Sequence, residues 1–103
     1  MKSFQLTEHD LADLEETISW LAAESEEAAL NLVNDLEAAF RFLAQWPGSG
    51  HLRSDLFPLP LRFWNASGYL IVYEPRTRPI TIVAVLHGSR DAVSLLRKRH
   101  LAP

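Results

Sequence analysis

The chain of 103 residues contains no cysteine, and this absence excludes disulfide bonds and thiol catalysis. A chain without cysteine is suited to a reducing compartment. Its four histidines are scattered, and no two of them have the spacing of a helical or knuckle-type zinc site. We therefore expect neither a metal site nor a cofactor.

Long apolar runs and glycine-rich loops are also missing. No apolar stretch approaches the ~20 residues of a membrane-spanning helix, and the first ten residues lack the apolar core of a signal peptide. We therefore expect a cytoplasmic protein without membrane contact. Only four glycines occur, and the sequence contains neither a phosphate-binding glycine loop nor a Gly-x-Ser-x-Gly nucleophile motif.

Lysine is scarce, and the charges are unevenly distributed. Residues 1–50 contain ten acidic and two basic residues, whereas residues 51–103 contain three acidic residues, seven arginines and one lysine. The net charge of −3 argues against avid, non-specific nucleic-acid binding, while arginine suits the carboxylate or phosphate groups of a partner. The composition is that of a globular protein, and the length predicts a single domain over residues 1–103.

Two helices are predicted in the first half, after a short alternating segment at residues 2–6 that indicates a strand. Thr7 with Asp10 three residues later has the pattern of a capping box at a helix start. The apolar face of this helix comprises Leu11, Leu14, Ile18, Leu21 and Ala22. Ser25 is a typical cap for a second helix. Its apolar face comprises Ala29, Leu32, Val33, Leu36, Phe40 and Leu43. Proline and glycine end it at residues 46–50, so we expect an antiparallel helical hairpin.

The second half predicts strands after an irregular connector at residues 47–60. The expected strands are residues 61–64, 69–73 and 80–86, with a hairpin turn at 65–68 and a loop at 74–79. Residues 92–96 indicate a short terminal helix. The fold class is therefore α+β: an N-terminal strand and an antiparallel helical hairpin packed on a mostly antiparallel sheet, in the order β-α-α-β-β-β plus a short C-terminal helix. The last two strands are expected to be central, and the sheet face away from the helices to remain partly open.

His87 is the first candidate for chemistry, because it follows the end of a strand and an imidazole titrates near neutral pH. The alternative interpretation is a histidine that forms hydrogen bonds within its own loop. Arg90 is expected either to pair locally or to reach a phosphate or carboxylate of a partner, with Asp91 capping the terminal helix.

A second set of residues is interpreted as a partner-binding surface. Arg62 and Trp64 share one face of a predicted strand, and strand aromatics either stack on a partner or belong to the core. The candidates for binding the target or a neutralising partner are Arg53, Arg62, Trp64, Tyr73, Arg90, Arg97, Lys98 and Arg99.

Several segments, in this order and spacing, carry a resemblance to a known family. They are Asp13-Leu14-Glu15-Glu16, Glu27-Ala28-Ala29, Leu36-Glu37-Ala38-Ala39-Phe40, Trp46-Pro47-Gly48, Arg62, Gly68-Tyr69-Leu70-Ile71-Val72-Tyr73, and Val85-Leu86-His87-Gly88-x-Arg90-Asp91. With them the chain resembles the ParE-type toxins of the ParE/RelE superfamily of bacterial toxin–antitoxin systems. The resemblance covers nearly the whole chain and implies a RelE/ParE-like fold.

This resemblance also implies a function and its alternatives. ParE-type members poison DNA gyrase, whereas RelE-type members cut mRNA in the ribosome with several lysines and arginines and a tyrosine or histidine. Here Lys2 and Lys98 are the only lysines, neither lies on the strands predicted within residues 61–86, and no acidic or lysine general base accompanies the reduced set Arg62, His87 and Arg90. The first hypothesis is thus a non-enzymatic gyrase inhibitor in a hetero-oligomer with a ParD-like antitoxin, touching DNA only through that antitoxin. The others are a RelE-type mRNA endonuclease and a non-toxic binding module of the same fold.

Overall fold

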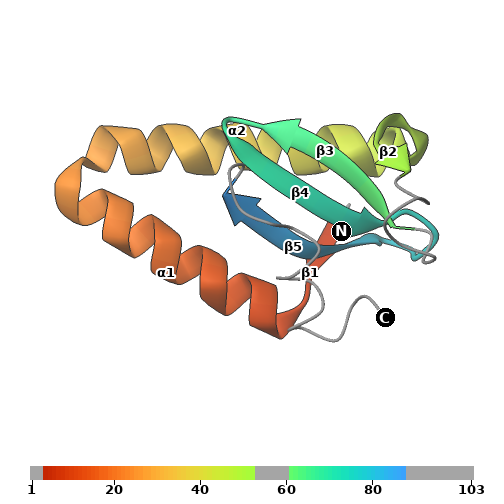
Figure 1. Ribbon diagram of the computed structural model, residues 1–103, viewed down its shortest axis with the longest axis horizontal. Helices are drawn as coiled ribbons and strands as arrows, with labels where there is room; N and C mark the ends of the chain where they lie inside the picture. Colours follow the sequence, from red (N-terminus) through yellow and green to blue (C-terminus); the bar gives the residue numbers. More distant parts are fainter. Residues whose placement is uncertain (1–3, 53–60, 88–103) are drawn as a thin grey trace.

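The computed structural model describes residues 4–52 and 61–87 of the chain (Figure 1). Its elements are β1 (Phe4–Leu6), α1 (Glu8–Glu24), α2 (Glu26–Gln45), the 3-10 turn η1 (Pro47–Ser49), β2 (His51–Leu52), β3 (Arg62–Ala66), β4 (Tyr69–Glu74) and β5 (Ile80–His87). The predicted α+β fold is confirmed, with two helices on a mostly antiparallel sheet. The terminal helix expected at residues 92–96 lies outside the described residues.

Both helices begin at the predicted caps. Thr7 Oγ1 accepts a hydrogen bond from the Asp10 N–H at 3.2 Å, and Ser25 Oγ accepts one from the Ala28 N–H at 3.1 Å. Ser25 also closes α1, because its own N–H donates to the Leu21 carbonyl at 2.8 Å. A single residue therefore separates the helices, which lie antiparallel (Figure 1).

The predicted capping box is only half formed, because the Asp10 side chain points elsewhere. The Thr7 N–H donates to the Ile82 carbonyl at 3.3 Å, so it does not need a carboxylate. Asp10 is fully buried, and its Oδ1 accepts a hydrogen bond from the Val85 N–H at 3.1 Å. The pairing of β1 with β5 ends at Ile82. Beyond this point the Asp10 carboxylate accepts a hydrogen bond from the backbone of the β5 edge, which β1 no longer covers.

The five described strands have the order β1-β5-β4-β3-β2, with β1 parallel to β5 and all other pairs antiparallel. The predicted central position of β4 and β5 is confirmed. Ser67 and Gly68 make the turn from β3 to β4, with φ values of 55° and 81° that a two-residue hairpin turn requires. The short β2 and η1 correct the prediction of an irregular connector, because a two-residue strand is too short to show an alternating pattern.

A β-bulge interrupts the pairing of the two central strands. Val72 lies opposite Ala84, but Tyr73 lies opposite Ile82, so Val83 is an extra residue in β5. Val83 and Ala84 consequently both belong to the cluster on the sheet face away from the helices. The bulge explains why β5 is a continuous apolar run rather than an alternating one.

Apolar residues are buried on both faces of the sheet. The helix-facing cluster comprises Leu32, Leu36, Phe40, Leu43, Ile71, Tyr73, Ile80 and Ile82. The opposite cluster comprises Leu61, Phe63, Val72, Val83, Ala84 and Leu86. Each fully buried Leu, Ile or Val contributes about 1.5–3 kcal/mol. The expectation of a partly open second face is wrong, because Val72 and Ala84 on that face are 0% exposed.

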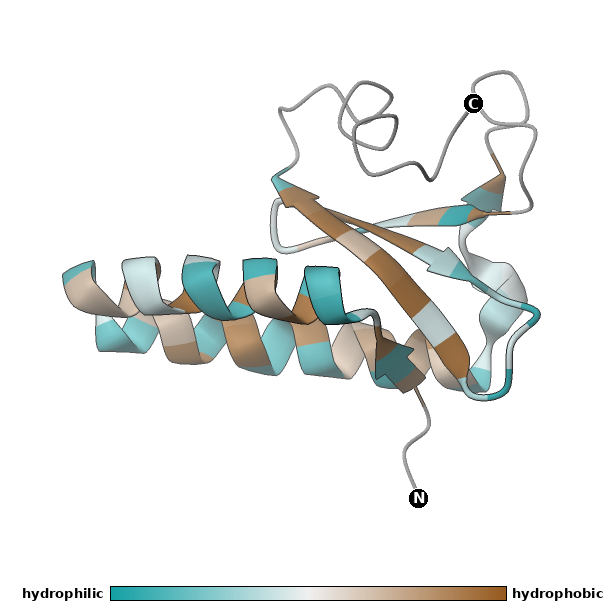
Figure 2. Cartoon of the chain, turned by 90° about the horizontal axis from the view of Figure 1, so that it is seen from below, coloured by the Kyte–Doolittle hydropathy of each residue, from teal (hydrophilic) through white to brown (hydrophobic). Residues whose placement is uncertain are grey.

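The two helices are buried to different degrees. Helix α2 buries five positions of its predicted apolar face, whereas the buried residue of α1 is Asp10. Leu11, predicted on the apolar face of α1, is 45% exposed. Figure 2 shows hydrophobic residues dominating the central strands, while both helices alternate hydrophobic and hydrophilic residues. Helix α2 is thus the main cover of the sheet.

Candidate protein-binding surface

The charge asymmetry of the sequence is also a separation in space. Residues 4–37 contain ten acids and neither lysine nor arginine, whereas the described residues from 38 onward contain four arginines and one glutamate. The joined end of the helical hairpin projects beyond the sheet, and the end of α2, β2 and the β4–β5 loop gather at the opposite end (Figure 1). We call residues 41–52, Arg62 and residues 74–80 the basic end.

The turn after α2 is fastened to the sheet by Tyr73, which is 0% exposed. The Tyr73 hydroxyl donates to the Pro47 carbonyl at 2.6 Å and accepts from the Gly50 N–H at 2.9 Å. Burial raises the pKa of Tyr73, and the Gly50 hydrogen bond and Arg62 offset only part of this shift. Gly50 allows the close approach, since a Cβ there would lie 2.6 Å from the Tyr73 hydroxyl oxygen.

Arg62 holds the same turn from β3. Its Nη1 donates to the Gly50 carbonyl at 2.7 Å and to the Gly48 carbonyl at 3.3 Å. Arg62 and Tyr73 were both predicted as binding residues. The burial of Tyr73 leaves no ring surface for stacking on a partner, so in this structure it supports the turn.

Large exposed apolar side chains surround this turn. Phe42 and Trp46 are 41% and 56% exposed, and Leu52 is 52% exposed. The Phe42 ring packs against the half-buried Trp64 in a tilted arrangement, with ring centroids 5.4 Å apart, and Trp46 follows Phe42 by one helical turn. We call Phe42, Trp46, Leu52 and Trp64 the aromatic surface. Aromatic residues beside arginine are typical of protein interfaces.

Sequence reasoning found Trp64 but missed the other three members of the aromatic surface. Trp46 was interpreted only as the end of a helix. Phe42 lies between Phe40 and Leu43 of the predicted apolar face without belonging to it, and a large aromatic off that face was the available indication. Leu52 lay in the segment interpreted as a connector.

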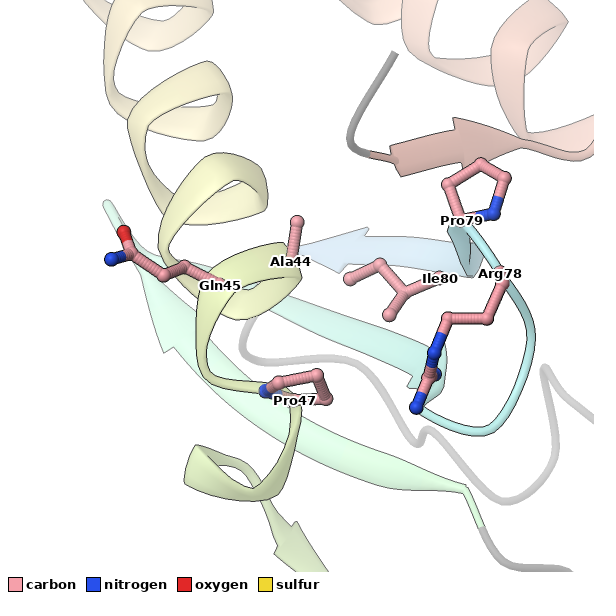
Figure 3. Close-up of a pocket in the computed structure, with 6 residues that line it drawn as sticks. All are labelled: Ala44, Gln45, Pro47, Arg78, Pro79 and Ile80. Atoms are coloured by element: carbon pink, nitrogen blue, oxygen red, sulfur yellow. The ribbon is translucent and has the colours of Figure 1, made fainter. Parts of the chain in front are cut away.

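A pocket of about 290 Å³ lies between the end of α2 and the β4–β5 loop (Figure 3). It is lined by Ala44, Gln45, Pro47, Arg78, Pro79 and Ile80. Arg78 Nη1 donates to the Pro75 and Thr77 carbonyls at 3.0 and 3.1 Å, which anchors the guanidinium in its own loop.

Arg76, in the same loop, is engaged differently. Its Nε and Nη2 donate to the two carboxylate oxygens of Glu74 at 3.1 and 3.2 Å. These side-chain hydrogen bonds lower the pKa of Glu74. Arg76 is thus paired with an acid, whereas Arg78 donates to backbone carbonyls.

The candidate catalytic residues do not converge in the described part of the chain. His87 is exposed, pairs with Tyr69 across the strands and meets its ring edge-on at a centroid distance of 5.4 Å. Arg62 pairs with Tyr73, four residues further along β4 and on its other side. This offset is roughly 13 Å along the strand at 3.3 Å per residue. The structure therefore does not bring Arg62 and His87 together.

The remaining predicted binding residues, Arg53, Arg90, Arg97, Lys98 and Arg99, lie outside the described residues. Within residues 4–52 and 61–87, no three His, Asp or Glu side chains are grouped so as to hold a metal ion. In the same ranges no helix has the length and apolarity needed to cross a membrane.

A search of curated proteins finds no match. Residues 5–92 match the family described as the ParE toxin of the type II toxin–antitoxin system parDE. The match begins in β1 and extends beyond the end of β5. Toxins of this family pair with an antitoxin. Because the match covers most of its length, the chain belongs to the ParE toxin family of type II toxin–antitoxin systems.

Proposed function

We propose that this toxin acts by binding and inhibiting DNA gyrase, and that a ParD-like antitoxin holds it inactive in the cytoplasm. The family match over residues 5–92 is the observation that carries the proposal. The basic end supports a protein partner, because an acidic, amphipathic segment that folds on binding would find both arginines and apolar side chains there.

The positions of the candidate catalytic residues favour inhibition by binding over mRNA cleavage. A ribonuclease must activate a 2′-hydroxyl and stabilise the charge on the adjacent phosphate within one site. Arg62 and His87 pair at opposite ends of β4, and Arg62 Nη1 donates to two backbone carbonyls. The RelE-type alternative is therefore the second candidate.

The order of events after induction tests the proposal. The chain is expressed from an inducible promoter while plasmid supercoiling, a DNA-damage reporter and amino-acid incorporation are followed in time. We expect supercoiling to fall and DNA damage to rise before translation slows, and co-expression of the neighbouring antitoxin gene to restore growth. Early arrest of translation with cleaved mRNA would replace gyrase by the ribosome as target, and absence of toxicity would indicate a binding module.

Variants separate the two mechanisms. His87→Ala is expected to retain full toxicity if the toxin acts by binding gyrase, and to lose it if His87 takes part in RNA cleavage. Arg62 is left unchanged in this test, because its guanidinium holds the Gly48–Gly50 turn and its removal would also disturb folding.

A further inference from the structure

The pocket at the basic end combines one cation with uncharged walls. Five of its six lining residues are uncharged, and four of these are Ala44, Pro47, Pro79 and Ile80, which offer apolar surface (Figure 3). Its volume of about 290 Å³ lies just below the ~300–1,000 Å³ range of ligand sites. A site of this size accommodates one or two side chains rather than a nucleotide.

Arg78 is oriented for an anion by its own loop. Nη1 is fixed by two backbone carbonyls, and among the described residues neither Nε nor Nη2, which form the other edge of the guanidinium, donates a hydrogen bond. That edge matches a carboxylate in two parallel hydrogen bonds. Since the loop hydrogen bonds already restrict the side chain, less rotamer entropy is lost on binding.

The charges around the pocket limit the ligand to a single negative group. No acid lines it, and Glu74 at the end of β4 is paired with Arg76. The C-terminal end of α2, which carries Ala44 and Gln45, brings partial negative charge and so opposes a multiply charged anion. A phosphodiester would place its polar sugar groups against the apolar walls. A carboxylate on a short apolar stem instead suits both the single cation and the apolar walls.

We propose that this pocket binds an acidic residue and its adjoining apolar side chain in a peptide segment of the antitoxin. The carboxylate pairs with Arg78, and the apolar side chain packs on Ala44, Pro47 and Ile80. The identity of the partner rests on the proposed function, whereas the chemistry of the pocket does not. The pairing of the acidic residue with Arg78 thereby adds a charged contact to the apolar contacts that the neighbouring aromatic surface offers.

The pocket itself is tested with the purified full chain and two blocked dipeptides, N-acetyl-leucyl-glutamyl amide and N-acetyl-leucyl-glutaminyl amide. Their binding is followed by NMR on the backbone amides of Ala44, Gln45 and Ile80. We expect saturable shifts with the glutamyl peptide, with a dissociation constant on the order of millimolar, and binding about tenfold weaker with the glutaminyl peptide. Equal binding of both peptides, or shifts elsewhere only, would overturn the proposal.

Three variants assign the binding to the pocket. Arg78→Gln removes the cation and Ala44→Leu fills the space, and each is expected to weaken glutamyl-peptide binding at least about fivefold. Arg76→Gln is the control, because it removes one positive charge from the same loop but from an arginine that is paired with Glu74. It should change glutamyl-peptide binding less than about twofold. Equal losses from Arg78→Gln and Arg76→Gln would reduce the effect to general charge and contradict a specific site.

A final arm separates this inference from the proposed function. The product of the neighbouring antitoxin gene is titrated against the wild-type chain and Arg78→Gln, with the dinucleotide ApA as a nucleic-acid probe of the pocket. Weaker antitoxin binding by Arg78→Gln supports the inference, and unchanged tight binding overturns it while the toxin assignment stands. Saturable ApA binding at Ala44 and Ile80 would instead assign the pocket to RNA. If the antitoxin binds neither protein, the proposed partner is wrong, and the dipeptide result alone decides the pocket.

Discussion

Tyr73 uses both hydrogen-bonding capacities of its hydroxyl to hold the turn after α2. Tyr73→Phe leaves the Pro47 carbonyl and the Gly50 N–H without this partner, and should lower the free energy of unfolding by about 1–3 kcal/mol. Tyr69→Phe is the control, because Tyr69 is half-buried at the start of β4. This substitution should change the free energy of unfolding by less than about 0.5 kcal/mol. Urea unfolding measures both, and equal effects would show that the hydroxyl does not hold the turn.

Two glycines of the same turn differ in the space around them. A Cβ at Gly50 would lie 2.6 Å from the Tyr73 hydroxyl oxygen and 2.7 Å from a ring carbon, whereas a Cβ at Gly48 would meet nothing within 4 Å. Gly50→Ala is therefore expected to destabilise the fold by about 1–3 kcal/mol through overpacking, and Gly48→Ala to be nearly neutral. Thermal unfolding compares them, and a neutral Gly50→Ala would contradict the tight contact.

The raised pKa of Tyr73 predicts a dependence of stability on alkaline pH. The native state holds the phenol proton more tightly than the unfolded state, whose ordinary pKa is 10.0. This contribution to stability is complete below pH 10 and is lost as pH rises through the native pKa. In Tyr69→Phe, which retains one tyrosine, absorbance at 295 nm should show ionisation above pH 10; a midpoint at or below 10 would contradict the burial argument.

Single residues also mark where prediction from sequence ended. The caps Thr7 and Ser25 were predicted because their hydrogen bonds are local. The hydrogen bond of the Asp10 carboxylate could not be predicted from the sequence, since its donor, the Val85 N–H, lies 75 residues away. Tyr73 was interpreted as a binding residue because strand aromatics have the same pattern whether they stack on a partner or fill the core.

At the scale of elements, Asp10 attaches α1 to the edge of β5. Asp10→Ala removes the acceptor of the Val85 N–H from a buried site, and we expect a loss of about 2–3 kcal/mol in unfolding free energy with faster hydrogen exchange at Val85. Glu8→Ala is the matched control, because Glu8 is an exposed acid in the same first turn. Unchanged exchange at Val85 in Asp10→Ala would show that the carboxylate does not hold this edge.

The elements themselves were largely predictable. Helix α2 and strands β4 and β5 follow from periodicity and from apolar runs, which depend on neighbours in sequence. Three features could not be predicted, because each depends on pairing or packing with distant segments. They are the extra residue Val83, the two-residue β2 and the covered second sheet face. The pocket beside Arg78 likewise exists only where the β4–β5 loop meets the end of α2.

At the scale of the whole molecule, the joined end of the helical hairpin, where Glu24 ends α1 and Glu26 begins α2, lies at the opposite end from the basic end (Figure 1). The uneven distribution of acidic and basic residues is visible in the sequence. The fold places the joined end of the hairpin and the basic end on separate parts of the surface. The basic end carries the aromatic surface and is therefore where we place the antitoxin. A surface dominated by such contacts should lose affinity when apolar anchors are removed, and should respond less to added salt than a nucleic-acid site would.

This placement predicts the effect of removing an anchor. Trp46→Ala is expected to weaken antitoxin binding by about 2 kcal/mol or more, since exposed tryptophans are frequent hot spots of interfaces. Trp20→Ala is the control, because Trp20 is 66% exposed on the acidic α1 and should leave binding unchanged. Isothermal titration calorimetry with the product of the neighbouring gene measures both, and a larger loss in Trp20→Ala would place the antitoxin on the helical hairpin.

A supercoiling assay with purified components tests most directly whether gyrase is the target of this toxin. Relaxed plasmid, gyrase and ATP are incubated with the purified chain, with and without prior addition of its antitoxin. We expect dose-dependent loss of supercoiling that the antitoxin prevents, and the same loss with His87→Ala. Full supercoiling at a large excess of folded toxin, together with mRNA cleavage when the same preparation is added to translating ribosomes, would contradict the account.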